Sequence, residues 1–399
     1  MFNICNFFCL DNCVSKTSNN VLIFLNPKSG AGTSIRDFNQ KLLPALKENN
    51  IGFEAIVTEG KNHCFEVAKH KQNLNAFKAV IIMSGDGLVF EWVNGIYQRN
   101  DKSNILSKLP IGIVPTGSGN GLLSSVLSAN NQSLQKNGFQ ERAIKNVSNP
   151  SALSSFVNLM HIETIHKNYV AFLSVGWGLL ADIDIESERW RKALGSNRFF
   201  VEAVIKTIKL KTYKGKLWYY KKDLSSSYED YNEKCLPVYS NNETLVTIDS
   251  LSIFDEDDSF HPEVLDDNYI EKNVPSLNET LPRTWKYIEE EFLFIYAVTI
   301  SHISRDGFYM PNAKLDDSSI YLTYCLRKDI PSRFSIVQFL SDIENGNHLK
   351  HSFVKCIPVS SFRLESFNIE SPIVVDGEII ETSKIQASMT DLKINVISK

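Results

Sequence analysis

Long apolar runs, secretory features and paired cysteines are all missing from this chain of 399 residues. No apolar run reaches 18 residues, so we expect no transmembrane helix. The N-terminus has no basic segment, and Asn6, Asp11 and Asn12 interrupt its apolar stretch, which argues against a secretory signal. The 7 cysteines form neither a CxxC pair nor a zinc-type spacing. We therefore predict a cytoplasmic protein with reduced thiols.

Charge is distributed unevenly, although the formal net charge is only −4. Residues 221–291 hold 18 of the 46 acidic and 6 of the 42 basic residues, which leaves 28 acidic and 36 basic residues elsewhere. A basic body suits an anionic substrate or a membrane surface, and a solvated surface without a specific partner is the alternative. The Ser, Asn, Asp and Glu content of residues 221–291 predicts a disordered insertion.

The N-terminal part alternates short apolar stretches with amphipathic ones. We expect strands at 21–25, 53–57, 79–83 and 111–115, with helices through residue 49, at 62–73 and through residue 97. Short buried strands joined by helices indicate a parallel sheet with helices on both faces. Ligands bind such sheets at the carboxyl ends of the strands, so the loops that follow these strands should share one crevice.

After residue 155 the pattern becomes rich in strands. We expect strands at 169–178, 292–301, 319–326, 353–359, 361–366, 372–380 and 392–398, and helices near 186–212 and 332–344. This pattern predicts a largely antiparallel β-sandwich. The predicted fold class is α/β plus β, with a doubly wound parallel sheet before the sandwich. The predicted divisions are a tail at 1–20, a first domain at 21–154 and a second domain at 155–399.

Three glycine-rich loops follow predicted strands. They are NPKSGAGT at 26–33, SGDG at 84–87 and TGSGN at 116–120. Their spacing fits neither the P-loop pattern GxxxxGK[ST] nor the dinucleotide pattern GxGxxG. Glycines let the backbone approach a phosphate, and a helix N-terminus favours an anion. Each loop alone fits an ordinary turn, but three such loops on one sheet favour a nucleotide-binding crevice.

Asp86 stands between the two glycines of the second loop. A carboxylate beside the γ-phosphate of a nucleotide can accept the proton of an attacking hydroxyl group. A helix N-cap is the alternative role for Asp86, and the two roles can coexist. Glu91, five residues later, can direct the same site or bind a metal ion.

A charged segment at 181–200 is the fourth group of candidate residues. Its acids are Asp182, Asp184, Glu186 and Glu188, and its arginines are Arg189, Arg191 and Arg198. The arginines can hold a transferring phosphoryl group, and the acids can bind a cationic group of the acceptor. A solvated surface helix is the alternative. Downstream, Phe200, Val204 and Ile208 share a helical face among lysines, which fits either the core or a lipid or membrane contact.

At these residues the chain resembles the sphingosine kinases, within the diacylglycerol-kinase-like lipid kinases. The resemblance covers roughly residues 21–220 and 292–398. It is carried, in order, by LNPKSGAG, TEGKNH, MSGDGLVFEWVNG, PTGSGNGL, SVGWGLLADIDIESERWR, LGSNRF, SFRLES and VVDGEII. It implies a Rossmann-like nucleotide-binding domain, a β-sandwich lipid-binding domain, and the use of ATP and Mg²⁺ to phosphorylate sphingosine. A peripheral membrane surface and a homodimer are expected, and no nucleic acid.

The resemblance also implies roles for individual residues. Asp86 corresponds to the catalytic base, which also contacts the substrate. Ser84 and Glu91 correspond to positions of the head-group site, and Asp184 to the carboxylate that binds the lipid. The implied nucleotide-binding positions are Asn26, Pro27, Lys28, Thr58, Asn62, Gly117, Ser118, Gly119, Arg191, Arg198, Asp376, Gly377 and Glu378. No metal-binding residue is assigned.

One argument about the substrate comes from the residues themselves. Sphingosine carries an ammonium group beside its primary hydroxyl group, whereas ceramide and diacylglycerol carry no cation there. A desolvated ammonium group needs a carboxylate partner, and Asp184, in an apolar segment rich in strands, can supply one. A kinase for ceramide or diacylglycerol and a non-catalytic lipid-binding homologue are the alternatives.

The chain departs from the family pattern at several positions. Phe90 and Trp92 replace the usual His and Val, and we expect them to reshape the entrance of the site. Ser29 stands where glycine is common, and one extra residue separates Arg191 from Arg198. Gly121 replaces the usual alanine, and we expect this change to be mild.

The N-terminal tail bears on localisation. Cys5, Cys9 and Cys13 recur every four residues. Reversible palmitoylation explains such a spacing, and a disordered tail with incidental cysteines is the alternative. Together with the resemblance, the tail predicts a cytoplasmic protein with reversible membrane association.

Overall fold

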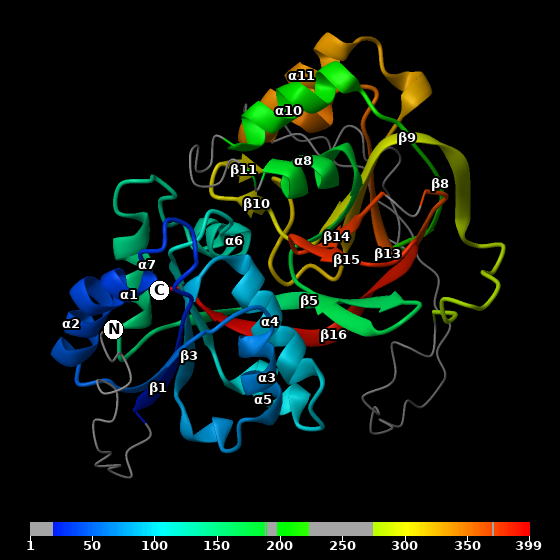
Figure 1. Ribbon diagram of the computed structural model, residues 1–399. Helices are drawn as coiled ribbons and strands as arrows, with labels where there is room; N and C mark the ends of the chain where they lie inside the picture. Colours follow the sequence, from blue (N-terminus) through cyan, green and yellow to red (C-terminus); the bar gives the residue numbers. More distant parts are fainter. Residues whose placement is uncertain (1–18, 188, 190–197, 223–273, 369–370) are drawn as a thin grey trace, which may run out of the picture. The chain divides into compact units, whose positions relative to one another are not determined.

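The computed structural model describes residues 19–187, 189, 198–222, 274–368 and 371–399. They form two compact units, and Figure 1 labels most of their helices and strands. The first unit contains the described residues up to Ser118, residues 126–156 and residues 394–399. The second contains residues 119–125 and the described part of 157–393. The division predicted from the sequence, 21–154 and 155–399, differs from this one at residues 119–125, 155–156 and 394–399.

The first unit is a parallel sheet with helices on both faces. Its strands, in spatial order, are β2 (Gly52–Val57), β1 (Asn20–Leu25), β3 (Ala79–Ser84) and β4 (Ile111–Pro115). Its helices are α1 (Ser34–Asp37), α2 (Leu43–Glu48), α3 (His63–His70), α4 (Asp86–Tyr97), α5 (Lys102–Lys108) and α7 (Phe139–Val147), with a π-helical turn at Phe38–Leu42. Helices α1, α2 and α7 lie on one side of the strands in Figure 1, and α3, α4 and α5 on the other. The predicted doubly wound sheet is confirmed.

The burial of β1 and β3 explains why their sequences are apolar without alternation. All six residues of β3 are buried, as are five of the six residues of β1. Both faces of the strands are covered, so neither face needs polar side chains. The strand order reverses between β1 and β3, which makes the carboxyl ends of these two strands the topological switch point. Sheets of this type bind their ligands at that point.

Residues 394–399 complete the first unit, far along the chain from the rest of it. They include the end of β16 (Lys384–Ile397), where Val396 pairs in parallel with Ile111 of β4. Ile397 is buried in the core of this unit. The carbonyl oxygen of Ser398 accepts hydrogen bonds from the side-chain amides of Gln132 and Asn146. The sequence predicted the strand but not its place beside β4.

The second unit is built mainly from antiparallel strands. They are β5 (Ser154–Thr164), β6 (Asn168–Ala171), β7 (Ser174–Gly178), β8 (Tyr213–Lys221), β9 (Lys286–Val298), β10 (His302–Ser304), β11 (Gly307–Phe308), β12 (Ile320–Leu326), β13 (Lys355–Ser366), β14 (Ile373–Val375), β15 (Glu378–Ile380) and most of β16. Strands β8 and β12 each pair with both β9 and β13, so the ladder of these four strands returns on itself. The predicted antiparallel region is confirmed.

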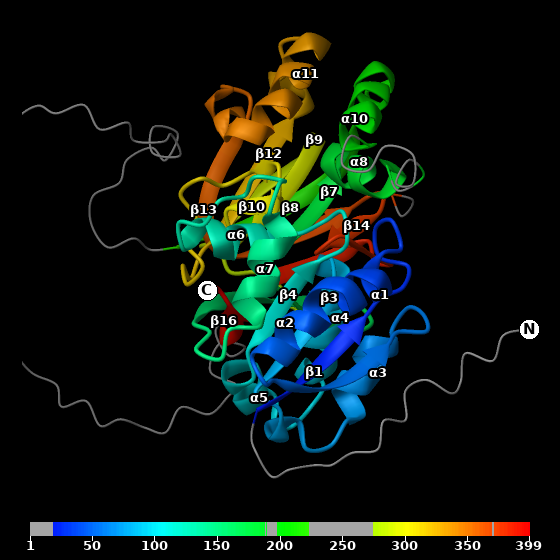
Figure 2. The ribbon, with the colours of Figure 1, turned by 90° about the vertical axis from the view of Figure 1, so that its left-hand side faces the viewer.

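Among the described residues, three α-helices accompany these strands. They are α8 (Leu179–Ser187), α10 (Arg198–Lys209) and α11 (Arg333–Asp342). Helices α10 and α11 lie side by side, as Figure 2 shows. The main core of the unit includes Phe294 and Val298 of β9 and Phe339 of α11, whose ring stacks on that of Phe294 at 5.1 Å between centroids. A further helix, α6 (Gly121–Ala129), starts in the second unit and continues in the first.

Several elements differ from the prediction. The single strand predicted at 169–178 is two strands, β6 and β7, while the two predicted at 353–366 are one, β13. Strand β9 starts at Lys286, inside the range assigned to the insertion, whose residues 223–273 lie outside the described residues. Strand β8 was not predicted, because lysines on its outer face obscure the alternation of its inward Leu217 and Tyr219. Strand β5 and helices α5 and α7 were also missed.

Candidate functional site

The three glycine-rich loops come together in the first unit. Gly30 has a φ of +53°, and a Cβ atom on it would lie 2.2 Å from the carbonyl oxygen of Thr116. A Cβ atom on Gly117 would lie 2.7 Å from the backbone nitrogen of Gly85. Side chains at these positions would overlap backbone atoms, so only glycine allows the loops to pack this closely. These contacts bring the loops together, as the sequence predicted, and a nucleotide-binding crevice formed by them stays a prediction.

Hydroxyl and amide groups link the first two loops. Asn26 Nδ2 donates to Ser84 Oγ at 3.4 Å, and Ser84 Oγ donates to Ser29 Oγ at 3.3 Å. Asn26 Oδ1 accepts the backbone N–H of Lys28 at 3.0 Å, which forms an Asx turn. Pro27 lies half-buried in this turn, and Lys28 is exposed. The part played by Ser29 was not foreseen, although a hydroxyl group among glycines could have indicated it.

Asp86 is the first residue of α4 and is buried, with 6 % of its surface exposed. Gly85 occupies the N-cap position with an extended backbone, so the alternative in which Asp86 is the N-cap is wrong. A carboxylate in the first turn lies in the favourable field of the helix dipole. Asp86 also follows the carboxyl end of β3, next to the contact between Gly85 and Gly117. The structure thus places this acid at the topological switch point.

Glu91 supports the N-terminus of a neighbouring helix. Its two carboxylate oxygens accept the backbone N–H groups of Asn62 at 3.0 Å and Cys64 at 3.2 Å. These groups belong to the N-cap and first turn of α3, where N–H groups have no partner within the helix. Burial raises the pKa of the Cys64 thiol, and the nearby Glu91 carboxylate raises it further. The head-group role of Glu91 and the nucleotide role of the exposed Asn62 stay predictions.

Phe90 and Trp92 are core residues of the first unit. Their exposed fractions are 7 % and 1 %. The Trp92 ring packs against that of Phe24 in β1, with 5.4 Å between centroids. The expectation that these two residues reshape the entrance of the site is therefore wrong for Trp92, because its side chain is enclosed by the core.

The third loop has the groups that a phosphate requires. The Thr116 hydroxyl group is buried and has no hydrogen-bond partner within the part of the chain that the structure describes. Gly117 and Ser118 follow it half-buried, and Gly119 leads into the N-terminus of α6. A buried hydroxyl group without a partner and the backbone amides of a helix N-terminus are donors that can bind phosphate oxygens. Thr58, at the end of β2, is buried and donates its backbone N–H to Leu25 at 2.8 Å.

In the second unit, Asp376 and Gly377 form the two-residue loop of the hairpin between β14 and β15. Both residues have positive φ angles, +50° and +85°, as tight hairpin loops often require. The Asp376 carboxylate accepts three backbone N–H groups, those of Phe172 (2.9 Å), Leu173 (3.0 Å) and Ser174 (2.8 Å). Asp376 therefore fixes the turn between β6 and β7. Its role at the nucleotide, like that of the half-buried Glu378, stays a prediction.

Asp184 lies close to this hairpin loop. A Cβ atom on Gly377 would lie 3.8 Å from Asp184 Oδ2. Asp184 is half-buried on helix α8, so the expectation that a strand-rich segment delivers it is wrong. Asp182, by contrast, is buried and accepts the hydroxyl group of Tyr213 at 2.6 Å. Burial, together with this hydrogen bond, raises the pKa of Tyr213.

The predicted phosphate-binding arginines cannot be placed in the same detail. Arg191 lies outside the described residues, as do Cys5, Cys9 and Cys13, and Arg198 is the first residue of α10. Arg189 pairs with the buried Glu202, with 2.8 Å between Nη2 and Oε2. Lys206 is mostly buried and pairs with Asp182 and Glu186. Ile208, at the end of α10, is 65 % exposed.

Comparisons with known proteins identify the family of this chain. Residues 20–150 match the family of the diacylglycerol kinase catalytic domain. Sphingosine kinase 1 of Caenorhabditis elegans is 41 % identical over 95 % of this chain and 81 % of its own length.

The chain belongs to the sphingosine kinase family.

Other relatives extend this result. Sphingosine kinase 1 of Homo sapiens is 28 % identical over 92 % of this chain and 88 % of its own length. The crystal structure of a diacylglycerol kinase from Bacillus anthracis str. Sterne covers 96 % of this chain and 97 % of its own, with a TM-score of 0.54 at 14 % identity. That likeness supports the fold. Membership of the sphingosine kinase family makes this chain a lipid kinase that uses ATP.

Two features are absent from the described residues of this member of the sphingosine kinase family. No helix among them is long and apolar enough to cross a membrane. No group of three or more His, Cys, Asp or Glu side chains in the described ranges could hold a metal ion. Mg²⁺ in kinases is bound largely by substrate phosphates and only one or two carboxylates, so Asp86 and the glycine-rich loops are compatible with it.

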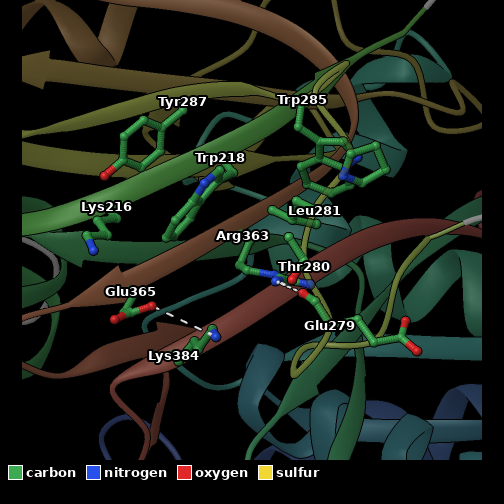
Figure 3. A pocket seen from close by; sticks show the side chains of 11 residues that line it. Lys216, Trp218, Glu279, Thr280, Leu281, Trp285, Tyr287, Arg363, Glu365 and Lys384 are labelled. Atoms are coloured by element: carbon green, nitrogen blue, oxygen red, sulfur yellow. Dashed lines mark hydrogen bonds and ion pairs between the residues drawn. The ribbon is translucent and has the colours of Figure 1, made fainter.

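A pocket of about 370 Å³ lies in the second unit, on the outer face of β8, β9, β13 and β16 (Figure 3). Its lining includes Trp218, Trp285 and Tyr287, and none of the site residues predicted from the sequence. Arg363, at its centre, donates to the carbonyl oxygen of Glu279 at 2.9 Å and to Gln386 Oε1. The arginine of the SFRLES motif therefore fixes the chain around Glu279.

Proposed function

We propose that this chain transfers the γ-phosphoryl group of ATP to the primary hydroxyl group of a sphingoid base, with Asp86 as the general base. The observation that carries the proposal is the position of Asp86. It is a buried carboxylate at the start of α4, immediately after the loop residue Gly85 that packs against Gly117. An acid in a phosphate-binding environment has a clear use if it receives a proton from the acceptor.

The transfer follows from this arrangement. As the hydroxyl oxygen of the lipid bonds to the γ-phosphorus atom, the bond from that atom to the β–γ bridging oxygen breaks and ADP leaves. Asp86 accepts the hydroxyl proton. Backbone amides near Gly30 and Gly117, with the Thr116 hydroxyl group, hold the phosphates, and Arg191 and Arg198 offset their negative charge. Mg²⁺, when bound to the phosphates, supplies further charge neutralisation.

We assign the preference for a sphingoid base over ceramide and diacylglycerol to Asp184. Its half-buried carboxylate beside Gly377 can pair with the ammonium group of a sphingoid base. A partly desolvated ammonium group without a carboxylate partner is costly, and ceramide and diacylglycerol offer no cation for Asp184 to bind. The relatives of this chain that are sphingosine kinases, from several organisms, support a sphingoid base as the substrate.

The proposal includes reversible contact with a membrane surface, where the lipid substrate resides. The end of α10 supports it, because Ile208 is largely exposed and Lys209 and Lys211 beside it are exposed as well. An apolar side chain among exposed lysines suits an interface with anionic lipids. Lys206 does not contribute, since its ammonium group is paired with Asp182 and Glu186.

Labelled ATP with a panel of sphingosine, dihydrosphingosine, ceramide and diacylglycerol tests the proposal. We expect label in the two sphingoid bases only. The D86N variant should lose about 10²- to 10⁴-fold in kcat, because it removes the base but preserves the side-chain shape. The matched control is D101N, which changes an exposed carboxylate paired with Arg99 in the same unit. Normal turnover by D86N, or equal labelling of ceramide, would refute the assignment.

A further inference from the structure

Helix α6 starts where the third glycine-rich loop ends, yet its first turn belongs with the second unit. The reason is a close packing of residues 119–125 against the hairpin of β10 and β11. Two residues of α6, Gly121 and Ser125, make this contact. They are four residues apart and therefore lie on the same face of the helix.

Gly121 brings the backbone of α6 against the backbone of β10. A Cβ atom at this position would lie 2.7 Å from the carbonyl oxygen of His302 and 2.8 Å from the carbonyl carbon of Ile303. These are backbone atoms, which cannot swing aside as a flexible side chain can. The sequence suggested that glycine in place of alanine would be a mild change here. The structure shows instead that this chain has no room for the methyl group of alanine.

Ser125 adds a reciprocal pair of hydrogen bonds to the same residue. Its Oγ accepts the backbone N–H of His302 at 2.9 Å and donates to the His302 carbonyl oxygen at 3.4 Å. The Ser125 side chain is fully buried, so water cannot replace these bonds. The hairpin itself is held in place, because His302 Nδ1 lies 2.9 Å from Ser301 Oγ and its ring packs on Phe308.

We propose that Gly121 and Ser125 are positioning residues for ATP. They dock the first turn of α6 on the backbone of His302 and Ile303, and this contact fixes the point at which the third glycine-rich loop enters the helix, so that the loop is held in position for binding phosphate. The inference rests on the proposed function only in taking ATP as the nucleotide. A displacement of about 1 Å in an active site can lower the reaction rate by up to about 100-fold, so the effect of a small shift of α6 should be measurable.

Two neighbouring serines provide the test. Ser124 and Ser125 are both fully buried on α6, but Ser124 Oγ donates to Asn120 O at 2.7 Å within its own helix. Displacement of trinitrophenyl-ATP by ATP, without lipid, should show about 10-fold weaker binding for S125A and a change below about 3-fold for S124A. In turnover assays, S125A should raise KM for ATP and leave KM for sphingosine nearly unchanged.

A second variant keeps the inference falsifiable if S125A does not fold. G121A retains both serines but forces α6 away from His302, so it should weaken ATP binding at least as much as S125A. Equal ATP affinities for the native protein, S124A, S125A and G121A would overturn the inference, as would equal weakening by S124A and S125A. Because the titration contains no lipid, a native protein that binds ATP but does not label sphingosine would contradict only the proposed function.

Discussion

We expect His348 to make the second unit sensitive to acid. It lies in a 3₁₀ turn, Asn347–Lys350, with 0 % of its surface exposed, and its ring packs on Tyr309 at 4.5 Å between centroids. Burial lowers the pKa of His348 to about 3, and the nearby His351 lowers it further, while Asp342 opposes the change. Asp342 is itself paired with His351 at 2.8 Å.

The sign and size of the effect follow from proton linkage. The unfolded chain binds a proton at this histidine near pH 6.5, whereas the folded chain does so only near pH 3. The stabilisation is therefore fully present above pH 6.5 and is lost as the pH falls toward 3. One pKa unit corresponds to about 1.4 kcal/mol, so the whole interval corresponds to roughly 5 kcal/mol. Between pH 7 and pH 5, His348 alone should lower the free energy of unfolding by about 2 kcal/mol.

Urea unfolding at pH 7, 6 and 5, followed by tryptophan fluorescence, measures this directly. We expect the His348→Leu variant to lose about 2 kcal/mol less than the native protein between pH 7 and pH 5. His70→Leu is the matched control, because the His70 side chain is 67 % exposed on α3. If the free energy of unfolding falls equally for the native protein and for His348→Leu between pH 7 and pH 5, the buried neutral histidine does not cause the loss of stability in acid.

Two carboxylates near the hairpin loop of β14 and β15 should behave differently. D376N places an amide N–H against the N–H of Phe172, Leu173 or Ser174, so we expect the free energy of unfolding to fall by about 2 kcal/mol in urea titrations. An unchanged stability with a higher KM for ATP would instead support a direct contact with the nucleotide. D184N should leave stability nearly unchanged and raise KM for sphingosine by about 10-fold or more, as expected for loss of a charged partner. A KM for sphingosine equal to the native value would remove Asp184 from the amine site.

Much of the first unit could be predicted because its signals are local. The buried runs at 21–25 and 79–83 and the glycines at 30, 85 and 117 mark strands and tight loops in the sequence itself. Membership of the family could be predicted for the same reason, since its motifs are short and contiguous.

What escaped prediction depends on distant partners. The Asp376 carboxylate is bound by backbone groups about 200 residues away, and such acceptors leave no trace in the sequence. Glu91 likewise serves α3 through backbone N–H groups. Trp92 was assigned to the entrance of the site because its neighbours are functional, whereas its size and its contact with Phe24 place it in the core. The close approach of Gly121 to His302 depends on tertiary packing alone.

Residues 394–399 also determine when the first unit of this kinase can finish folding during synthesis. Ser398 bonds to Leu153 across 245 residues of chain, and Val396 supplies the strand beside β4. A ribosome that adds about 5–20 residues per second needs on the order of 10–50 s to cover that stretch. Throughout this time the nascent first unit has all its glycine-rich loops but an open edge at β4. The parallel sheet of the first unit is therefore completed only after the second unit has been synthesised.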